Sequence, residues 1–368
     1  MGGMVSWRTW KGVGIYFAVL AGWLATTAMH IPDGYLSPIT CLILFLLVAP
    51  FWAIGLRRIR QNLSARSVPL IALMAAFSFV IMMFNVPLPG GTSGHAVGAA
   101  LAAILLGPEV AVIAISIAMI IQAFFFGDGG ILAIGANCFN MAVVIPYIAS
   151  AIYSAFSRGT PVTSRRRLAG AALAGWAGVT AGAFFAGVEF GLQPLLFKTA
   201  GGVPLYAPYP LAVAIPAMVL PHLLVAGVVE GTLTALVTGY LQRFNPKVLE
   251  VAENPAEALS PSGSYRLRWV WVGLAALAML TPLGLLAPGT AWGEWSTHEL
   301  ARLGMKSLPA GMEKLAGLWG APLARYNLPA LGNTSLGYLL SAGLGILIIV
   351  VVVWLFTRLL TAKRMPKE

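Results

Sequence analysis

Long apolar runs separated by short polar segments dominate the chain. The runs suited to crossing about 30 Å of hydrocarbon predict helices over residues 41–54, 70–84, 110–126, 132–154, 168–190, 211–241, 269–286 and 336–360. A shorter run, 96–106, is closely followed by Pro108 and predicts a short or tilted helix. We therefore expect an all-α polytopic membrane protein, with a bundle of about seven helices and two further C-terminal transmembrane helices.

Composition and charge support this prediction and add an orientation. The chain is 59% hydrophobic and 10% charged, and its mean hydropathy of +0.85 exceeds that of soluble domains. A net charge of +11 could indicate nucleic acid binding, but the basic residues lie between or after apolar runs, as the positive-inside rule describes. They gather at Arg57, Arg58, Arg60, Arg66; Arg158, Arg165, Arg166, Arg167; Arg243, Lys247, Arg266, Arg268; and Arg358, Lys363, Arg364, Lys367. We expect a multi-pass protein of the plasma membrane and no nucleic acid partner.

Several kinds of chemistry are disfavoured by the residues present. Cys41 and Cys138 lie inside apolar runs, which indicates packing rather than a disulfide or a thiolate metal site. The four histidines are scattered, and no H-E-x-x-H motif suggests an intramembrane hydrolase. No G-x-x-x-x-G-K-[ST] phosphate loop occurs. The chain is therefore not expected to be an enzyme, and energy for any transport must come from partners.

The first residues resemble a leader peptide. Arg8 and Lys11 precede an apolar run over 13–24, and small residues follow up to Ala28. Cleavage after Ala28 would make Met29 the first residue and His30 the second. The Met29 amine, the His30 amide nitrogen and His30 Nδ1 could then bind one metal ion. An uncleaved leader acting as an extra helix remains an alternative, and it would remove the amine ligand.

A second histidine is predicted on the same side of the membrane. Counting crossings from the basic clusters places residue 29 and the glycine-rich loop 85–95 outside. His95 ends this loop at the start of the next helix, where the helix dipole disfavours a charged imidazole. With His95 as fourth donor, the nitrogen set would be square-planar, which suits Ni²⁺ or Cu²⁺ and not Mg²⁺ or Ca²⁺. The alternatives are a surface polar residue for His30 and a helix cap for His95.

Other polar residues form a supporting set. We expect Asp33 to orient His30, Asp128 to attract a cation, and the amide side chains to hold the loop closed. The alternative for each is a hydrogen bond between neighbouring helices. The set is Asp33, Gln122, Asp128, Asn137 and Asn140. In residues 168–190, the small residues Ala174, Gly178, Gly182 and Ala186 permit close helix contact, either within the bundle or with a coupling subunit.

Three motifs carry a family resemblance. Residues 29–38 (MHIPDGYLSP), 91–95 (GTSGH) and 127–140 (GDGGILAIGANCFN) resemble the CbiM/NikM family, the substrate-capture components of cobalt and nickel energy-coupling-factor transporters. The resemblance covers residues 29–245 and implies that Met29, His30 and His95 bind the metal ion, which is the transported substrate and not a catalytic cofactor. Members usually begin at the equivalent of Met29, so the leader, residues 1–28, departs from the common form.

The remainder resembles the small accessory protein of these systems. After a predicted cytoplasmic linker, 246–268, residues 269–368 hold two spans around an outer Trp-, Gly- and Pro-rich segment, without the usual Pro-Asp-Gly motif. The resemblance implies a transmembrane coupling component and two cytoplasmic ATPases as partners, with cobalt feeding cobalamin synthesis or nickel feeding nickel enzymes. The sequence leaves cobalt or nickel open, although the resemblance favours cobalt slightly. A passive metal channel is the alternative function.

Overall fold

The computed structural model describes residues 30–62, 67–88, 92–253, 268–286 and 292–362. The expected leader, Met29, and much of the expected linker lie outside these residues. Seven of the described helices are long and apolar enough to cross a membrane: Pro38–Gln61, Pro108–Phe126, Ile134–Ser157, Arg165–Leu196, Leu211–Phe244, Trp269–Leu286 and Thr334–Leu359. A shorter apolar helix covers Val68–Met82. The predicted helical membrane protein is confirmed.

The first part of the chain forms a bundle around short, buried segments. Its helices are α2 (Pro38–Asn62), α3 (Ser67–Met82), α4 (Ala99–Leu106), α5 (Pro108–Ile121), α6 (Ile134–Asn137), α7 (Ile145–Ser157), α8 (Arg165–Leu196), α9 (Leu211–Pro221), α10 (Gly227–Phe244) and α11 (Pro246–Glu253). π-Helical turns η2 (Gln122–Phe126), η3 (Cys138–Val144) and η4 (His222–Ala226) continue α5, α6 and α9. A small antiparallel hairpin joins β1 (Val86–Leu88) to β2 (Thr92–Gly94).

Helix α4 is the short helix that the sequence predicts. Its eight residues span about 12 Å at 1.5 Å per residue, less than half of the hydrocarbon thickness. Ala99 to Leu105 are buried, so this helix lies inside the bundle with its first turn directed to the segment that carries His95. Gly107 and Pro108 separate α4 from α5. The short helix therefore brings a loop residue into the interior.

The small residues of α8 pack within the bundle. A Cβ on Gly178 would lie 3.0 Å from Ile145 of α7, and one on Gly182 would lie 2.9 Å from the Asn140 carbonyl oxygen. Ala174 and Ala186 are also buried. Close contact between α7 and α8 therefore accounts for this pattern without a coupling subunit.

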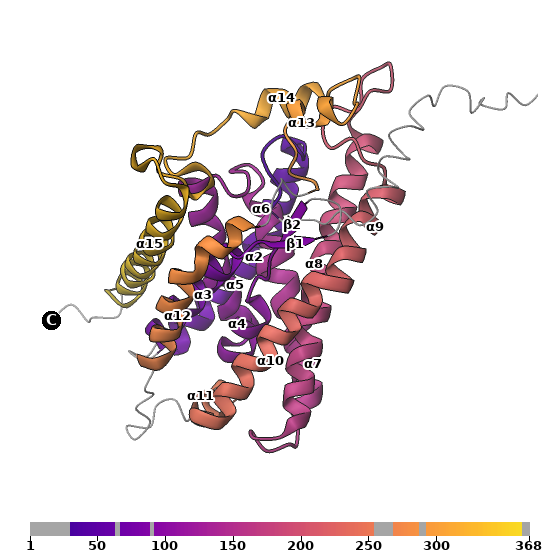
Figure 1. Cartoon of the computed structure of the whole chain (residues 1–368). Helices are drawn as coiled ribbons and strands as arrows, with labels where there is room; N and C mark the ends of the chain where they lie inside the picture. Colours follow the sequence, from indigo (N-terminus) through magenta and orange to yellow (C-terminus); the bar gives the residue numbers. More distant parts are fainter. Residues whose placement is uncertain (1–29, 63–66, 89–91, 254–267, 287–291, 363–368) are drawn as a thin grey trace, which may run out of the picture.

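The C-terminal part covers one end of the bundle and one side of it. Helix α12 (Arg268–Leu280) with its 3₁₀ continuation η6 (Thr281–Leu286), and α15 (Thr334–Ala362), lie beside α3. Between them, α13 (Thr297–Arg302), α14 (Ala310–Ala316) and the short turns η7 (Ala324–Tyr326) and η8 (Pro329–Leu331) lie across the end (Figure 1). The first residues of the predicted linker form α11, which packs on α10 and α4 with Val248 and Leu249 buried.

Candidate metal centre

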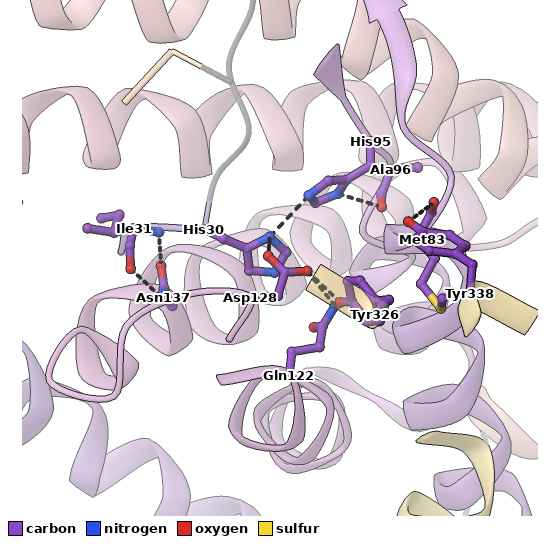
Figure 2. A network of polar contacts seen from close by, with 10 residues as sticks. All are labelled: His30, Ile31, Met83, His95, Ala96, Gln122, Asp128, Asn137, Tyr326 and Tyr338. Atoms are coloured by element: carbon purple, nitrogen blue, oxygen red, sulfur yellow. Dashed lines mark hydrogen bonds and ion pairs between the residues drawn. The ribbon is translucent and has the colours of Figure 1, made fainter. Parts of the chain in front are cut away.

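Two histidines that are 65 positions apart meet in the interior. His95 Nε2 lies 3.2 Å from His30 Nδ1, and the ring centroids are 4.9 Å apart. His30 is 2% exposed and His95 is 6% exposed. Figure 2 shows the two rings facing each other, His30 from the segment before α2 and His95 from the segment between β2 and α4.

The hydrogen bond at the other ring nitrogen assigns the tautomer of His95. Its Nδ1 lies 3.1 Å from the Ala96 carbonyl oxygen, which can only accept, so Nδ1 carries the hydrogen and Nε2 keeps its lone pair. Burial, and secondarily the neighbouring His30, lower the pKa of His95 to about 3. The ring is therefore neutral at physiological pH, as a metal ligand must be.

The separation of the two nitrogens fits a shared metal ion. With metal–nitrogen bonds of about 2.0–2.1 Å, adjacent ligand atoms lie roughly 2.8–3.4 Å apart for angles between 90° and the tetrahedral value. The observed 3.2 Å falls in this range. Within the part of the chain that the structure describes, no group of three or more His, Cys, Asp and Glu side chains could hold a metal ion. Further donors would have to come from the main chain or from other side chains.

Asp128 is the acidic residue that lies against His30. Its Oδ1 is 3.2 Å from His30 Nδ1, so without a metal ion this nitrogen can donate a hydrogen to Asp128 or to His95, and it must lose that hydrogen to bind a metal ion. On the other carboxylate oxygen, Oδ2 accepts from the Tyr326 hydroxyl and lies 3.4 Å from Gln122 Nε2. Gln122 Nε2 also donates to the Tyr326 oxygen at 2.9 Å. Figure 2 shows this continuous polar network.

The loop that carries Asp128, residues 127–133, follows the π-helical turn η2 and precedes α6 and the π-helical turn η3. Gly127 and Gly129 have φ values of 64° and 86°, which favour glycine. The Asp128 N–H donates to the Gln122 carbonyl at 3.1 Å. π-Helical turns occur frequently at functional sites. Here η2 ends at Phe126, two residues before Asp128, and η3 begins directly after Asn137.

The same loop fixes the segment that carries His30. Asn137 Oδ1 accepts from the Ile31 N–H at 2.8 Å, and Asn137 Nδ2 donates to the Ile31 carbonyl at 3.1 Å. The Gly130 N–H donates to that carbonyl too, at 2.9 Å. Asp33 accepts from the N–H groups of Ile131 and Leu132 at 3.0 and 2.8 Å. These hydrogen bonds to Ile31 therefore fix the position of His30, the residue before it.

Among the supporting residues, Asp33 differs from the expected role, and Asn140 takes the alternative role of a hydrogen bond between neighbouring helices. Asp33 binds the loop main chain, and it is Asp128 that contacts the His30 ring. Burial raises the pKa of the Asp33 carboxyl, against the effect of these hydrogen bonds. Asn140 Nδ2 donates to Glu189 Oε2 at 2.9 Å and links η3 to α8. The structure therefore groups His30, His95, Asp128, Gln122 and Asn137, whereas Asn140 serves another contact.

Comparisons with known proteins identify the family of the chain. The family model described as the cobalt uptake substrate-specific transmembrane region, CbiM, matches residues 30–248. The chain belongs to the CbiM family. A second model, the PDGLE domain, matches residues 266–362, although no Pro-Asp-Gly sequence occurs there. The accessory resemblance of the C-terminal part is confirmed.

Relatives of this CbiM-family chain are transition-metal transporters. It is 52% identical to the fused nickel transport protein NikMN of Rhodobacter capsulatus, over 88% of this chain and 95% of that one. It is 41% identical to the probable fused nickel transport protein LarMN of Lactiplantibacillus plantarum, over 88% and 96%. A solved truncated transition metal transporter is 48% identical, covers 58% of this chain and 97% of its own, and superposes with a TM-score of 0.54.

Two residues of this CbiM-family chain, Glu230 and Tyr326, contact the site in ways that the sequence did not predict. Glu230 of α10 accepts from the Val97 and Gly98 N–H groups at 2.8 and 3.0 Å, and so fixes the residues that follow His95. An acidic residue inside an apolar run was a signal for such a role, but its partner 132 and 133 positions away was not readable. Nothing in the sequence pointed to a contact of Tyr326 with the site, because this residue lies between the two C-terminal spans and outside the motifs that resemble the family.

Asn137→Ala is expected to weaken metal binding about 10–100-fold, the usual cost of losing a residue that orients a ligand. The substitution leaves the buried Ile31 N–H unpaired, at a cost of about 1–3 kcal/mol, and releases the residue next to His30. Asn137→Asp keeps the acceptor and should give a smaller loss. Competition with a chromogenic chelator measures both affinities, and an unchanged affinity of Asn137→Ala would contradict this role.

Proposed function

We propose that this protein captures Ni²⁺ or Co²⁺ at the outer face of the plasma membrane for ATP-driven import. The observation that supports it most directly is the 3.2 Å approach of His30 Nδ1 to His95 Nε2, both buried. With Met29 as the first residue, its amine and the His30 amide nitrogen would complete four nitrogen donors. The bound ion is the transported substrate.

Placement of the site on the outer face rests on charge. Residues 30–37 and the loop 127–133 lie at the end of the bundle covered by α13 and α14, whereas α7 ends at the opposite end (Figure 1). Arg158 follows α7 directly, and Arg57 and Arg58 lie near the end of α2 that is remote from residue 37. If these basic residues face the cytoplasm, the histidines face outward.

Nickel is the ion that we favour between the two candidates. The relatives that align with both parts of this chain are named nickel transport proteins. A planar set of nitrogen donors suits Ni²⁺, and affinity in such sites also rises from Co²⁺ to Ni²⁺. Import would then supply nickel enzymes, whereas a preference for Co²⁺ would connect the protein to cobalamin synthesis.

Transport requires partners in this proposal. A transmembrane coupling component and two cytoplasmic ATPases would supply the energy, and residues 266–362 would serve as a built-in accessory component. Uptake into vesicles separates this function from that of a passive channel. Transport that depends on ATP and on the ATPases supports import, whereas equal uptake without them indicates a channel.

N-terminal sequencing of the membrane-purified protein, together with analysis of its metal content, tests the ligand set. We expect metal-loaded protein to begin at Met29. Loaded, active protein that begins at Met1 or Met4 would exclude the amine as a ligand. A block on cleavage after Ala28 should likewise abolish metal capture while leaving the protein in the membrane.

A further inference from the structure

The C-terminal part contributes one side chain to the polar network of the site. The Tyr326 hydroxyl donates to Asp128 Oδ2, and Gln122 Nε2 donates to the Tyr326 oxygen at 2.9 Å. Asp128 Oδ1 faces His30 Nδ1 at 3.2 Å. Tyr326 is therefore one residue removed from a proposed metal ligand, although it belongs to the part of the chain that matches the PDGLE domain.

The position of Tyr326 is closely fixed. Its ring stacks on Phe126, with centroids 4.9 Å apart and planes inclined by 21°. The Ser341 hydroxyl donates to its carbonyl at 3.0 Å, and its own N–H donates to the Leu323 carbonyl at 2.9 Å. Leu323 in turn donates to the Phe125 carbonyl at 2.9 Å. These contacts join residues 323–326 directly to the helix end that precedes Asp128.

The backbone at this point is also unusual. Arg325 and Tyr326 both have a φ of 56°, a left-handed conformation that costs non-glycine residues about 1–2 kcal/mol each. Such strain concentrates where the surrounding structure needs a particular side-chain position. Here its result is a tyrosine hydroxyl placed on the buried side of Asp128.

The chemical effect of that hydroxyl is to orient a carboxylate. The Asp128 side chain is 22% exposed, so water competes for its oxygens. With Oδ2 held by Tyr326, Oδ1 is directed to the His30 ring, and the negative charge lies beside the position where two histidine nitrogens meet. Burial, and secondarily the charge of Asp128, raise the pKa of the Tyr326 hydroxyl well above its ordinary value. The hydroxyl therefore remains a donor at physiological pH.

We propose that Tyr326 is a positioning residue for metal capture, through which the C-terminal part holds the Asp128 carboxylate beside the two histidine nitrogens that would bind the ion. This role rests on the proposed function above. It assigns to the fused C-terminal part a direct contribution to the affinity of the site, in addition to covering it.

Tyr326→Phe in the full chain tests this role, with Tyr338→Phe as the matched control. Tyr338 lies in the same part, its ring is 5.4 Å from that of Tyr326, and its hydroxyl donates to the Met83 carbonyl at 2.9 Å instead of to Asp128. We expect Tyr326→Phe to weaken Ni²⁺ binding about 10–100-fold and Tyr338→Phe to leave it unchanged. Chelator competition on purified protein in detergent gives both affinities.

A double-mutant cycle separates positioning from packing. In an Asp128→Ala background, Tyr326→Phe should cause no further loss of Ni²⁺ affinity, because its effect passes through the carboxylate. Losses that simply multiply would overturn the proposal. If the wild type and Tyr338→Phe bind no Ni²⁺, the proposed function fails instead; if they bind it and Tyr326→Phe binds equally well, only the positioning role fails.

The phenyl ring of Tyr326→Phe keeps the stacking on Phe126, so the variant is expected to fold. If it does not, Gln122→Leu provides the second variant, because it removes the N–H donor to the Tyr326 oxygen and replaces a buried polar side chain with an apolar one of similar size. We expect a smaller but measurable loss of Ni²⁺ affinity, and an unchanged affinity would overturn the proposal.

Discussion

His95→Ala is expected to abolish capture of Ni²⁺ while leaving the helical bundle folded. A structural site of four ligands contributes about 10–16 kcal/mol, so an even division gives roughly 3 kcal/mol per ligand, or more than a hundredfold in affinity. The His95 ring makes its hydrogen-bonding contacts with Ala96 and His30 only, among those described. Its removal should therefore affect the site much more than the fold.

His298→Ala is the matched control for this loss. His298 is an exposed residue of α13 in the C-terminal part. It takes no part in the polar network around His30. We expect His298→Ala to bind Ni²⁺ like the wild type. Metal content after purification and the melting temperature in detergent should be measured for both variants. Binding by His95→Ala at wild-type affinity would exclude His95 as a ligand.

Gly130→Ala is expected to reduce metal affinity about a hundredfold, at the upper end of effects on residues that support ligands. A Cβ at this position would collide with the Asp33 N and Oδ1 atoms. The loop would have to move away, which would disturb the Gly130–Ile31 hydrogen bond and the bonds from Ile131 and Leu132 to Asp33. Overpacking of this kind also costs about 1–3 kcal/mol of stability.

Gly320→Ala serves as the control for Gly130→Ala. A Cβ on Gly320 would have no atom within 4 Å, and its φ lies outside the left-handed region. The same change should therefore leave affinity and melting temperature near those of the wild type. Equal behaviour of the two variants in chelator competition would show that the close approach of residues 130 and 33 has no part in metal capture.

Much of the fold was predictable because hydrocarbon thickness imposes a minimum length on apolar runs. The eight longer predicted runs all correspond to helices, and the run 96–106 gave the short helix α4. The crossing count predicted that residue 30 and the loop 85–95 share one face of the membrane, which is compatible with the contact between His30 and His95. Neither inference needed the position of any individual side chain.

The support around the histidines was not predictable in the same way. Asp33 and Asp128 are both acidic and both lie near the site, and only three-dimensional geometry decides that Asp128 contacts His30 while Asp33 binds main-chain N–H groups. Tyr326 reaches Asp128 across 198 positions, because α15 and α12 bring the C-terminal part against the bundle. Neither the composition nor the spacing of residues predicts contacts of this kind.

The carboxylate of Glu230 couples a membrane-spanning helix to the segment that carries His95. It joins α10 to Val97 and Gly98, two and three residues beyond His95. A displacement of α10 by one helical turn, about 5.4 Å, would break both hydrogen bonds or pull the start of α4 with it. A displacement of α10 would thus be transmitted to the segment that carries the His95 imidazole.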